Sequence, residues 1–117
     1  MHPMALLIFA AILGLMTVVS GFGKLSMKDN VVEMLNHVGL NERQIRLLGT
    51  VEILGAIGLL FGIWLPILGL LAALGFVAYF LGAVIAHIRV RDGIKDMAPA
   101  ILLTVLSIIV TVLQFSR

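Results

Sequence analysis

The sequence predicts an all-α protein: an integral membrane bundle of four antiparallel helices, with a short amphipathic interfacial helix between spans one and two. Three observations predict this fold, namely the composition, four long apolar segments and a one-sided distribution of basic residues. Of the 117 residues, 62% are hydrophobic and 12% charged, with a mean hydropathy of +1.20. Soluble domains are about 45–50% apolar and about 25% charged. A chain this small cannot bury such an excess in water, so we expect residues 1–117 to form a single transmembrane domain.

Four segments are long enough to be membrane spans, since crossing about 30 Å of hydrocarbon takes roughly 20 apolar residues. They cover about residues 4–22, 44–65, 67–89 and 98–115. The first has no basic leader region and no small-x-small cleavage site, so we interpret it as a retained span and not as a secretory signal.

The second span has a signal at each end. Asn41 followed by Gln44 is typical of a capping box at a helix start. At the other end, Trp64-Leu65-Pro66 predicts a tight turn, because proline cannot continue a helix and tryptophan suits the headgroup level. Spans two and three should therefore form an antiparallel hairpin.

The long first loop, residues 23–46, is predicted to contain a helix over about 27–38. Ser26 followed by Asp29 resembles a capping box, and apolar residues then recur at helical spacing as far as Gly39, a common helix terminator. Such a helix would lie along the membrane surface. An irregular loop is the alternative interpretation.

The basic residues predict the orientation of the spans, because lysine and arginine are enriched on the cytoplasmic side. Seven of the eight fall in the first and third loops, which four spans place on the same side: Lys24, Lys28, Arg43, Arg46, Arg89, Arg91 and Lys95. Arg117 alone falls on the other side. We therefore expect a multi-pass membrane protein with both termini on the non-cytoplasmic side.

Small and weakly polar residues indicate the faces along which the helices pack, since helices in lipid associate through close approach and interhelical hydrogen bonds. These residues are Gly55, Gly58 and Gly62 in the second span, and Thr104, Ser107, Thr111 and Gln114 in the fourth. The polar stripe of the fourth span is either a packing seam without chemistry or the wall of a ligand groove.

Glu52 is the carboxylate placed inside a predicted span, where a charge costs roughly 3 kcal/mol on insertion scales and normally has a partner. It lies six residues beyond Arg46, which is about 9 Å deeper along a helix. Lys24, His87 and Arg89 close the neighbouring spans on the same side. These four residues are predicted to converge, either as a structural clamp that fixes helix register or as a polar pocket for a quinone carbonyl, a lipid headgroup or a proton.

Several chemistries find no support in the residue pattern. The chain has no cysteine, which excludes disulfides, thiolate metal sites and cysteine nucleophiles. We identify no catalytic residues, no metal site and no covalently bound cofactor, because carboxylates and histidines lack ligand spacing and no nucleophile–base set is present. A redox enzyme acting alone is the least favoured function, and any enzymatic role is left open.

The chain resembles the DoxX-like family of small bacterial membrane proteins. The resemblance rests on Gly21-Phe22-Gly23-Lys24-Leu25, Gly39-Leu40, Gly49-Thr50-Val51-Glu52-Ile53-Leu54-Gly55-Ala56, Leu71-Ala72-Ala73-Leu74-Gly75 and Gly82-Ala83-Val84-Ile85-Ala86-His87-Ile88-Arg89. It implies a location in the bacterial inner membrane and a four-helix membrane bundle of the general kind seen in vitamin K epoxide reductase. A chain without cysteine cannot use that enzyme's dithiol chemistry. Carried over to this sequence, the family's polar positions are Lys24, Glu52, His87 and Arg89.

The resemblance leaves three functions open. The namesakes are subunits of a thiosulfate:quinone oxidoreductase, which implies an accessory subunit of a membrane redox system that binds a quinone or lipid headgroup. Other relatives are linked to receptor chaperoning and cargo handling, which implies a chaperone or assembly partner of a larger membrane protein. A small dimeric proton-coupled transporter with Glu52 as its carboxylate is the third. Expected partners are membrane lipid, a second copy or a larger membrane protein, and no nucleic acid.

Overall fold

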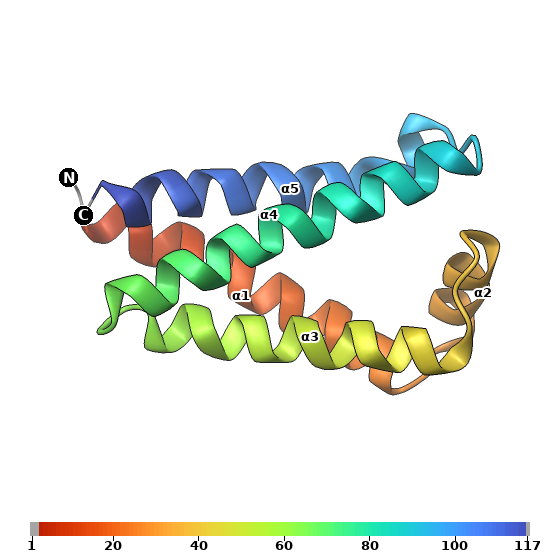
Figure 1. The fold of residues 1–117 in the computed structure, drawn as a ribbon, viewed down its shortest axis with the longest axis horizontal. Coiled ribbons are helices and arrows are strands. Elements are labelled where there is room, and N and C mark those ends of the chain that lie inside the picture. The colour runs from red at the N-terminus through yellow and green to blue at the C-terminus, as the bar shows by residue number, and fades with distance from the viewer. Residues whose placement is uncertain (1–2, 117) are drawn as a thin grey trace.

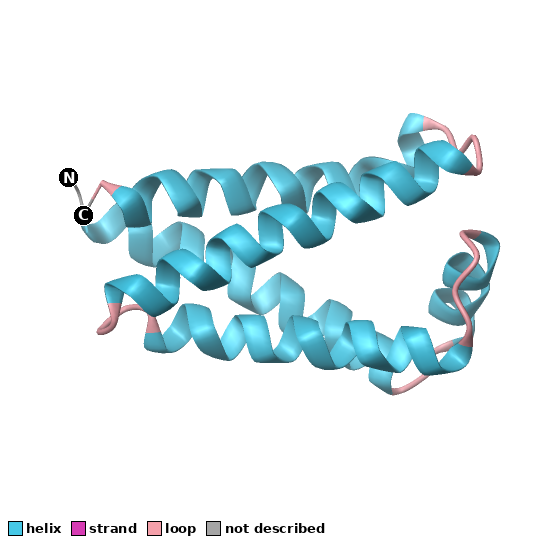
Figure 2. Cartoon of the chain, viewed as in Figure 1, coloured by secondary structure: helices cyan, strands magenta, loops and turns pink. Residues whose placement is uncertain are grey.

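The computed structural model describes residues 3–116, and within that range the chain is helical with short turns and no strands (Figures 1 and 2). The five helices are α1 (Pro3–Leu25), α2 (Asp29–His37), α3 (Glu42–Phe61), α4 (Pro66–Arg89) and α5 (Ile94–Phe115). All except α2 are long and apolar enough to cross a membrane. The predicted all-α membrane bundle is thus confirmed. Arg117, the basic residue assigned to the far side, lies outside the described residues.

The four long helices form two pairs that are joined at one end of the molecule. α1 packs chiefly on α3, and α4 chiefly on α5, with α3 and α4 connected by the predicted hairpin. Figure 1 shows both chain termini at the hairpin end and α2 at the opposite end, where α3 and α4 diverge. The basic first and third loops lie together at that opposite end. We call the two ends the hairpin end and the α2 end.

The start of α3 confirms the capping box predicted there. The Gln44 backbone N–H donates to Asn41 Oδ1 over 2.9 Å, and the Asn41 N–H donates to Gln44 Oε1 over 3.0 Å. The pair satisfies two backbone donors that a helix start would otherwise leave open. α3 ends at Phe61, and a turn then leads to Pro66 at the first position of α4.

The start of α2 differs from the prediction. The Ser26 backbone N–H still bonds to Phe22 O, so Ser26 belongs to the end of α1 and does not cap α2. The residue at the cap position is Lys28, whose side chain makes no capping bond. α1 runs further than the apolar pattern indicated, because the helix continues through Gly23 and Lys24 to Leu25, beyond the predicted end at Phe22. α2 itself begins at Asp29 and ends at His37, with Gly39 in the left-handed region at φ 96°.

An apolar core lies between the helix pairs. Leu13, Phe76, Phe80 and Val110 are almost completely buried at its centre. The rings of Phe76 and Phe80 stack with centroids 5.7 Å apart. This core joins α1, α4 and α5, and Leu59 adds α3.

The glycines of α3 allow the closest helix contacts at the hairpin end. A Cβ at Gly62 would overlap the backbone of Gly69 in α4, and a Cβ at Gly55 would overlap the ring of Phe76. A Cβ at Gly58 would lie 3.1 Å from the Ala72 Cβ, which is a tight contact but not an overlap. These helices therefore approach one another at a distance that larger side chains would prevent.

The polar stripe of α5 faces the inside of the bundle. Thr104 and Ser107 are buried, and their hydroxyls donate to carbonyls one turn back in the same helix over 2.7 Å. Thr111 makes the same bond to Ser107 O over 2.8 Å. Gln114 is buried beside Gly69 and donates to Gly62 O over 3.5 Å. The three hydroxyls therefore donate their hydrogen bonds within α5. Gln114 instead links α5 to the turn of the hairpin.

Candidate functional site: a buried ion pair beside an interfacial cavity

The site begins with a close crossing of α1 and α3 near the α2 end. A Cβ at Gly21 would lie 2.8 Å from Gly49 O, and a Cβ at Gly49 would lie 2.8 Å from Gly21 O. Two glycines facing each other thus allow the two backbones to come together. Lys24 lies one turn beyond Gly21 and Glu52 one turn beyond Gly49, so the crossing brings their side chains within reach.

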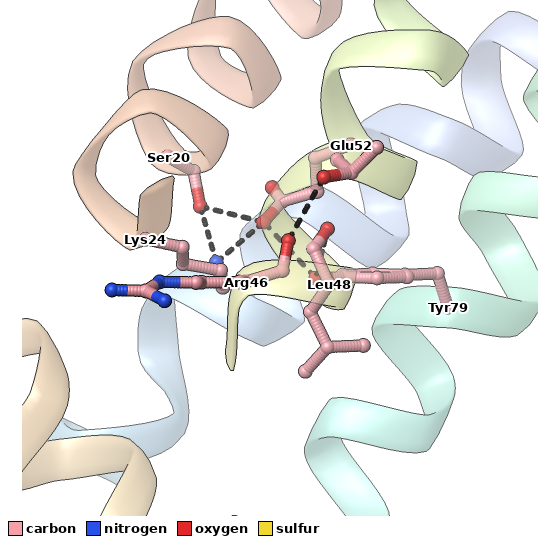
Figure 3. Close-up of polar contacts among 7 residues, drawn as sticks. Ser20, Lys24, Arg46, Leu48, Glu52 and Tyr79 are labelled. Atoms are coloured by element: carbon pink, nitrogen blue, oxygen red, sulfur yellow. Dashed lines mark hydrogen bonds and ion pairs between the residues drawn. The ribbon is translucent and has the colours of Figure 1, made fainter. Parts of the chain in front are cut away.

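Lys24 and Glu52 form a buried ion pair across this crossing (Figure 3). Glu52 is completely buried and Lys24 is 9% exposed. The Lys24 ammonium also donates to Ser20 Oγ over 2.8 Å, and Ser20 Oγ donates to Glu52 Oε1 over 3.2 Å. From α4, the Tyr79 hydroxyl donates to Glu52 Oε1 over 3.0 Å. The cluster therefore connects three helices through one carboxylate oxygen.

The other oxygen of Glu52 has a different environment. Oε2 is buried and has no hydrogen-bond partner among the described residues. A carboxylate offers about four lone-pair positions, and three donors crowd onto Oε1 here. Such an uneven arrangement holds the carboxylate in one orientation and leaves acceptor capacity on the opposite oxygen.

A second polar cluster, which we call the histidine–aspartate bridge, lies at the α2 end, where α4 ends. Asp92 Oδ2 lies 2.6 Å from His87 Nδ1, and Asp92 Oδ1 lies 2.8 Å from His37 Nε2. An ionised carboxylate only accepts hydrogen bonds, so each ring presents an N–H at that nitrogen. The bridge joins the end of α2 to the end of α4 through the α4–α5 loop.

The end of α4 explains how Asp92 reaches His87. Arg91 adopts a left-handed conformation with φ 60°, its N–H bonds to Ile88 O, and the Asp92 N–H bonds to His87 O over 3.0 Å. This six-to-one bond is typical of a helix ending that folds the chain back over its last turn. Asp92 thereby lies above the His87 ring.

The bridge changes the acidity of its carboxyl group. The hydrogen bond from His87, and then that from His37, hold the pKa of Asp92 below its usual value of 3.8. The partial burial of Asp92 opposes this shift in its pKa but does not outweigh it. Asp92 therefore stays ionised as an acceptor for both rings down to low pH.

A cavity of about 420 Å³ separates the two clusters. All five helices contribute to its walls, which are mostly apolar. Its polar lining residues are Ser20, Lys24, Tyr79, His87 and Asp96. Sites for small organic ligands typically measure about 300–1,000 Å³ and combine apolar walls with a few polar groups. We call this space the interfacial cavity, because it lies at the α2 end where the spans emerge.

The four predicted site residues are placed in three different environments. Lys24 and Glu52 meet in the buried ion pair, whereas His87 is 6% exposed, bonds to Asp92 and shares only the cavity wall with Lys24. Arg89 is exposed and makes no ion pair within residues 3–116. The expectation that Arg89 joins a buried cluster is corrected here: two residues rotate a helix by about 200°, so Arg89 leaves the face that His87 presents.

Several residues of the site were not predicted from the sequence. Ser20 lies one turn before Lys24, a spacing that could have indicated it. Tyr79 is the single tyrosine of the chain and lies two turns before His87 on α4. His37 and Asp92 belong to no sequence motif, because the bridge between them depends on how the chain folds back after α4. Among residues 3–116, no group of His, Asp or Glu is arranged to hold a metal ion.

The fold and the composition define a small multi-pass membrane protein built as a helical bundle. The chain belongs to the DoxX-like family, whose model matches residues 8–110, a range that includes most of each span and every residue of both clusters. No curated protein and no solved structure matches the chain.

Proposed function

We propose that the interfacial cavity binds the ring of a membrane quinone, and that the chain serves as an accessory subunit of a membrane redox system. The observation that supports this most directly is the position of Lys24, a buried cation at the inner wall of a mostly apolar cavity. A quinone ring is flat, apolar and carries two carbonyl acceptors, which is the combination such a cavity accommodates.

The Lys24 ammonium supplies the hydrogen bond in this proposal. It has three N–H donors, and within the described residues two are used by Ser20 and Glu52. The third is available to a carbonyl oxygen in the cavity. Glu52 keeps the ammonium in place, and Ser20 and Tyr79 keep Glu52 in place.

The apolar walls favour a quinone over a phospholipid headgroup. A phosphate desolvated among alanine, leucine and phenylalanine side chains requires several donors, whereas Lys24 is the only lysine or arginine that lines the cavity among residues 3–116. The accessory role rests on the family resemblance. A chain without cysteine holds no dithiol, so a partner subunit would supply the electrons.

Binding of ubiquinone-1 to the purified protein in nanodiscs tests this function. We expect ubiquinone-1 to raise the unfolding temperature, because a ligand at 100 times its Kd stabilises the folded state by about 2.7 kcal/mol. Ala83→Leu narrows the cavity and should abolish the effect, whereas Ala98→Leu, on the exposed face of α5, should retain it.

A second arm of the experiment distinguishes the quinone from a lipid. Nanodiscs of phosphatidylglycerol are compared with nanodiscs of phosphatidylcholine in the absence of quinone. Stabilisation by phosphatidylglycerol that Ala83→Leu removes would assign the cavity to a lipid headgroup. No response to either molecule would refute ligand binding at this site. Trp64 is a poor reporter for these titrations, because it lies in the turn between α3 and α4, at the end remote from the cavity.

A further inference from the structure

Helix α2 forms a roof over the interfacial cavity but belongs to only one half of the molecule. Met34 and Leu35 of α2 line the cavity, and Leu35 is the one buried residue of this nine-residue helix. α2 packs on α1 and α3 and makes no backbone-level contact with α4 or α5. The described bond that joins it to the other half is the contact of His37 with Asp92.

Both connections of α2 contain a residue in the left-handed region. Met27 precedes the helix with φ 52°, and Gly39 follows it with φ 96°. Hinges are typically a few residues at element ends that absorb a change in backbone angles. Glycine allows such a change freely, and a non-glycine residue in this region is held there by its surroundings. α2 is therefore a short, weakly buried helix with a hinge-type residue at each end.

We propose that the histidine–aspartate bridge is a pH-dependent latch that holds α2 over the interfacial cavity, and that its release opens the cavity at the membrane surface. The identity of what enters rests on the proposed quinone function, whereas the latch itself does not. The bridge suits this role because it connects α2 to α4, two helices that do not pack directly on each other.

The chemistry of the bridge sets its dependence on pH. Imidazoles change charge between about pH 5 and 8, and a hydrogen bond between two charged partners is about twice as strong as a neutral one. With both rings protonated and Asp92 ionised, the latch is held by two ion pairs. Neutral rings would leave two N–H donors, which hold the same carboxylate less strongly.

At low pH the trend reverses, and the latch weakens as the pH falls further. The pKa of Asp92 is lowered in the latched form, so the carboxylate contributes above its ordinary pKa, and this contribution disappears as the pH falls through the lowered value. The latch is therefore tightest while Asp92 is ionised and both rings are protonated. Other charged groups on the surrounding elements are Lys24 and Asp96, which line the cavity with His87, and Glu33, Arg89, Arg91 and Lys95.

Spin labels across the cavity mouth test the latch without any ligand. Asn36→Cys on α2 and Ala98→Cys on α5 introduce two exposed labelling sites into the cysteine-free chain. Pulsed electron–electron double resonance then measures the distance between the two spin labels in nanodiscs. We expect one short distance at pH 6 and a second, longer distance that grows several-fold in population at pH 8. Labels at Phe61→Cys and Val112→Cys, exposed residues near the hairpin end, should show no change.

Two variants identify the bridge as the cause. Asp92→Asn removes the carboxylate and should show the longer distance at both pH values. His37→Gln, at an exposed position where a glutamine amide can still donate, should reduce the pH response. Identical distances at pH 6 and pH 8, or an Asp92→Asn protein that matches the unmodified chain, would overturn the latch.

A rate measurement separates the latch from the proposed function. Association of ubiquinone-1 should be several-fold faster in Asp92→Asn than in the unmodified chain. If α2 moves with pH but ubiquinone-1 does not bind, the quinone function fails and the latch stands. If ubiquinone-1 binds equally fast in both proteins and the spin labels do not respond, the latch fails and the quinone function stands.

Discussion

The two ends of the bundle show two ways of joining helices in an apolar solvent. At the hairpin end, Gly62 and Gly69 bring α3 and α4 into backbone contact, and Gln114 closes the space beside them. At the α2 end, α3 and α4 diverge (Figure 1). A cavity lies there, and charged side chains join α1 to α3 and the α4–α5 loop to α2 and α4. Close packing leaves no room for a ligand, whereas polar contacts hold helices together across a space.

This difference assigns distinct roles to the two kinds of contact. The hairpin end depends on shape, so added volume should harm it. The α2 end depends on charge pairs, so the loss of one partner should harm it more than the loss of both. Four substitutions test that contrast.

The largest effect is expected from Glu52→Ala. This change leaves the buried Lys24 ammonium without its counter-charge, and breaking a buried pair in this way typically costs about 3–5 kcal/mol. Reversible unfolding in mixed dodecyl maltoside and SDS micelles measures the loss. The double variant Lys24→Met/Glu52→Leu removes both charges and should recover most of the stability. A double variant as unstable as Glu52→Ala would contradict the role assigned to the pair.

Gly62→Ala should have the next largest effect. The added methyl group overlaps the backbone of Gly69, which cannot move aside without separating α3 from α4. Overpacking of this kind costs about 1–3 kcal/mol. The matched control is Gly14→Ala in α1, where a Cβ meets nothing within 4 Å and the change should stay within about 0.5 kcal/mol. Equal effects of the two substitutions in the same unfolding assay would show that the contact with Gly69 is unimportant.

Tyr79→Phe should cost less, about 1 kcal/mol, because Lys24 and Ser20 still donate to the same carboxylate oxygen. Thr111→Val is the control, since it also removes a hydroxyl, but one that bonds within its own helix. Its unfolding free energy should change by no more than about 0.5 kcal/mol. If both variants match the unmodified chain, the hydroxyl of Tyr79 does not support Glu52.

The smallest effect is expected from Asp92→Asn, and it should depend on pH. The unmodified chain loses the contribution of Asp92 as the pH falls through its lowered pKa, and the variant has no such contribution to lose. Unfolding temperatures measured from pH 3 to pH 6 should therefore differ most at pH 6 and draw closer as the pH falls below 3.8. Asp29→Asn, an exposed carboxylate on α2, should leave the pH dependence as it is. Parallel curves for Asp92→Asn and the unmodified chain would contradict the bridge.

The fold was largely predictable from the sequence, because its signals are local. Each span is a continuous apolar run, and the capping box of Asn41 and Gln44 needs only a spacing of three residues. Pro66 marked the hairpin for the same reason. The one local signal that was misread, Ser26 with Asp29, failed because α1 continues through the glycine and lysine that follow its apolar run.

The site was only partly predictable. A carboxylate in a span requires a partner, and a lysine at the same depth was a reasonable candidate, so Lys24 and Glu52 could be paired. The rotation of each helix about its axis could not be read from hydropathy. That rotation is set by the contact of Gly21 with Gly49 and by the fit of the Phe76 ring against Gly55. It places Tyr79 beside Glu52.

The sequence by itself determined that the chain crosses the membrane four times, that the basic loops share one end and that Glu52 needs a counter-charge. These are consequences of the cost of exposing polar groups to hydrocarbon, which acts on each segment separately. Only the tertiary structure decided that the spans diverge around a cavity, that Arg89 stays outside it and that Asp92 joins two histidines over it. Those outcomes depend on how the helices rotate and fold back against one another, which is a property of packing between distant residues.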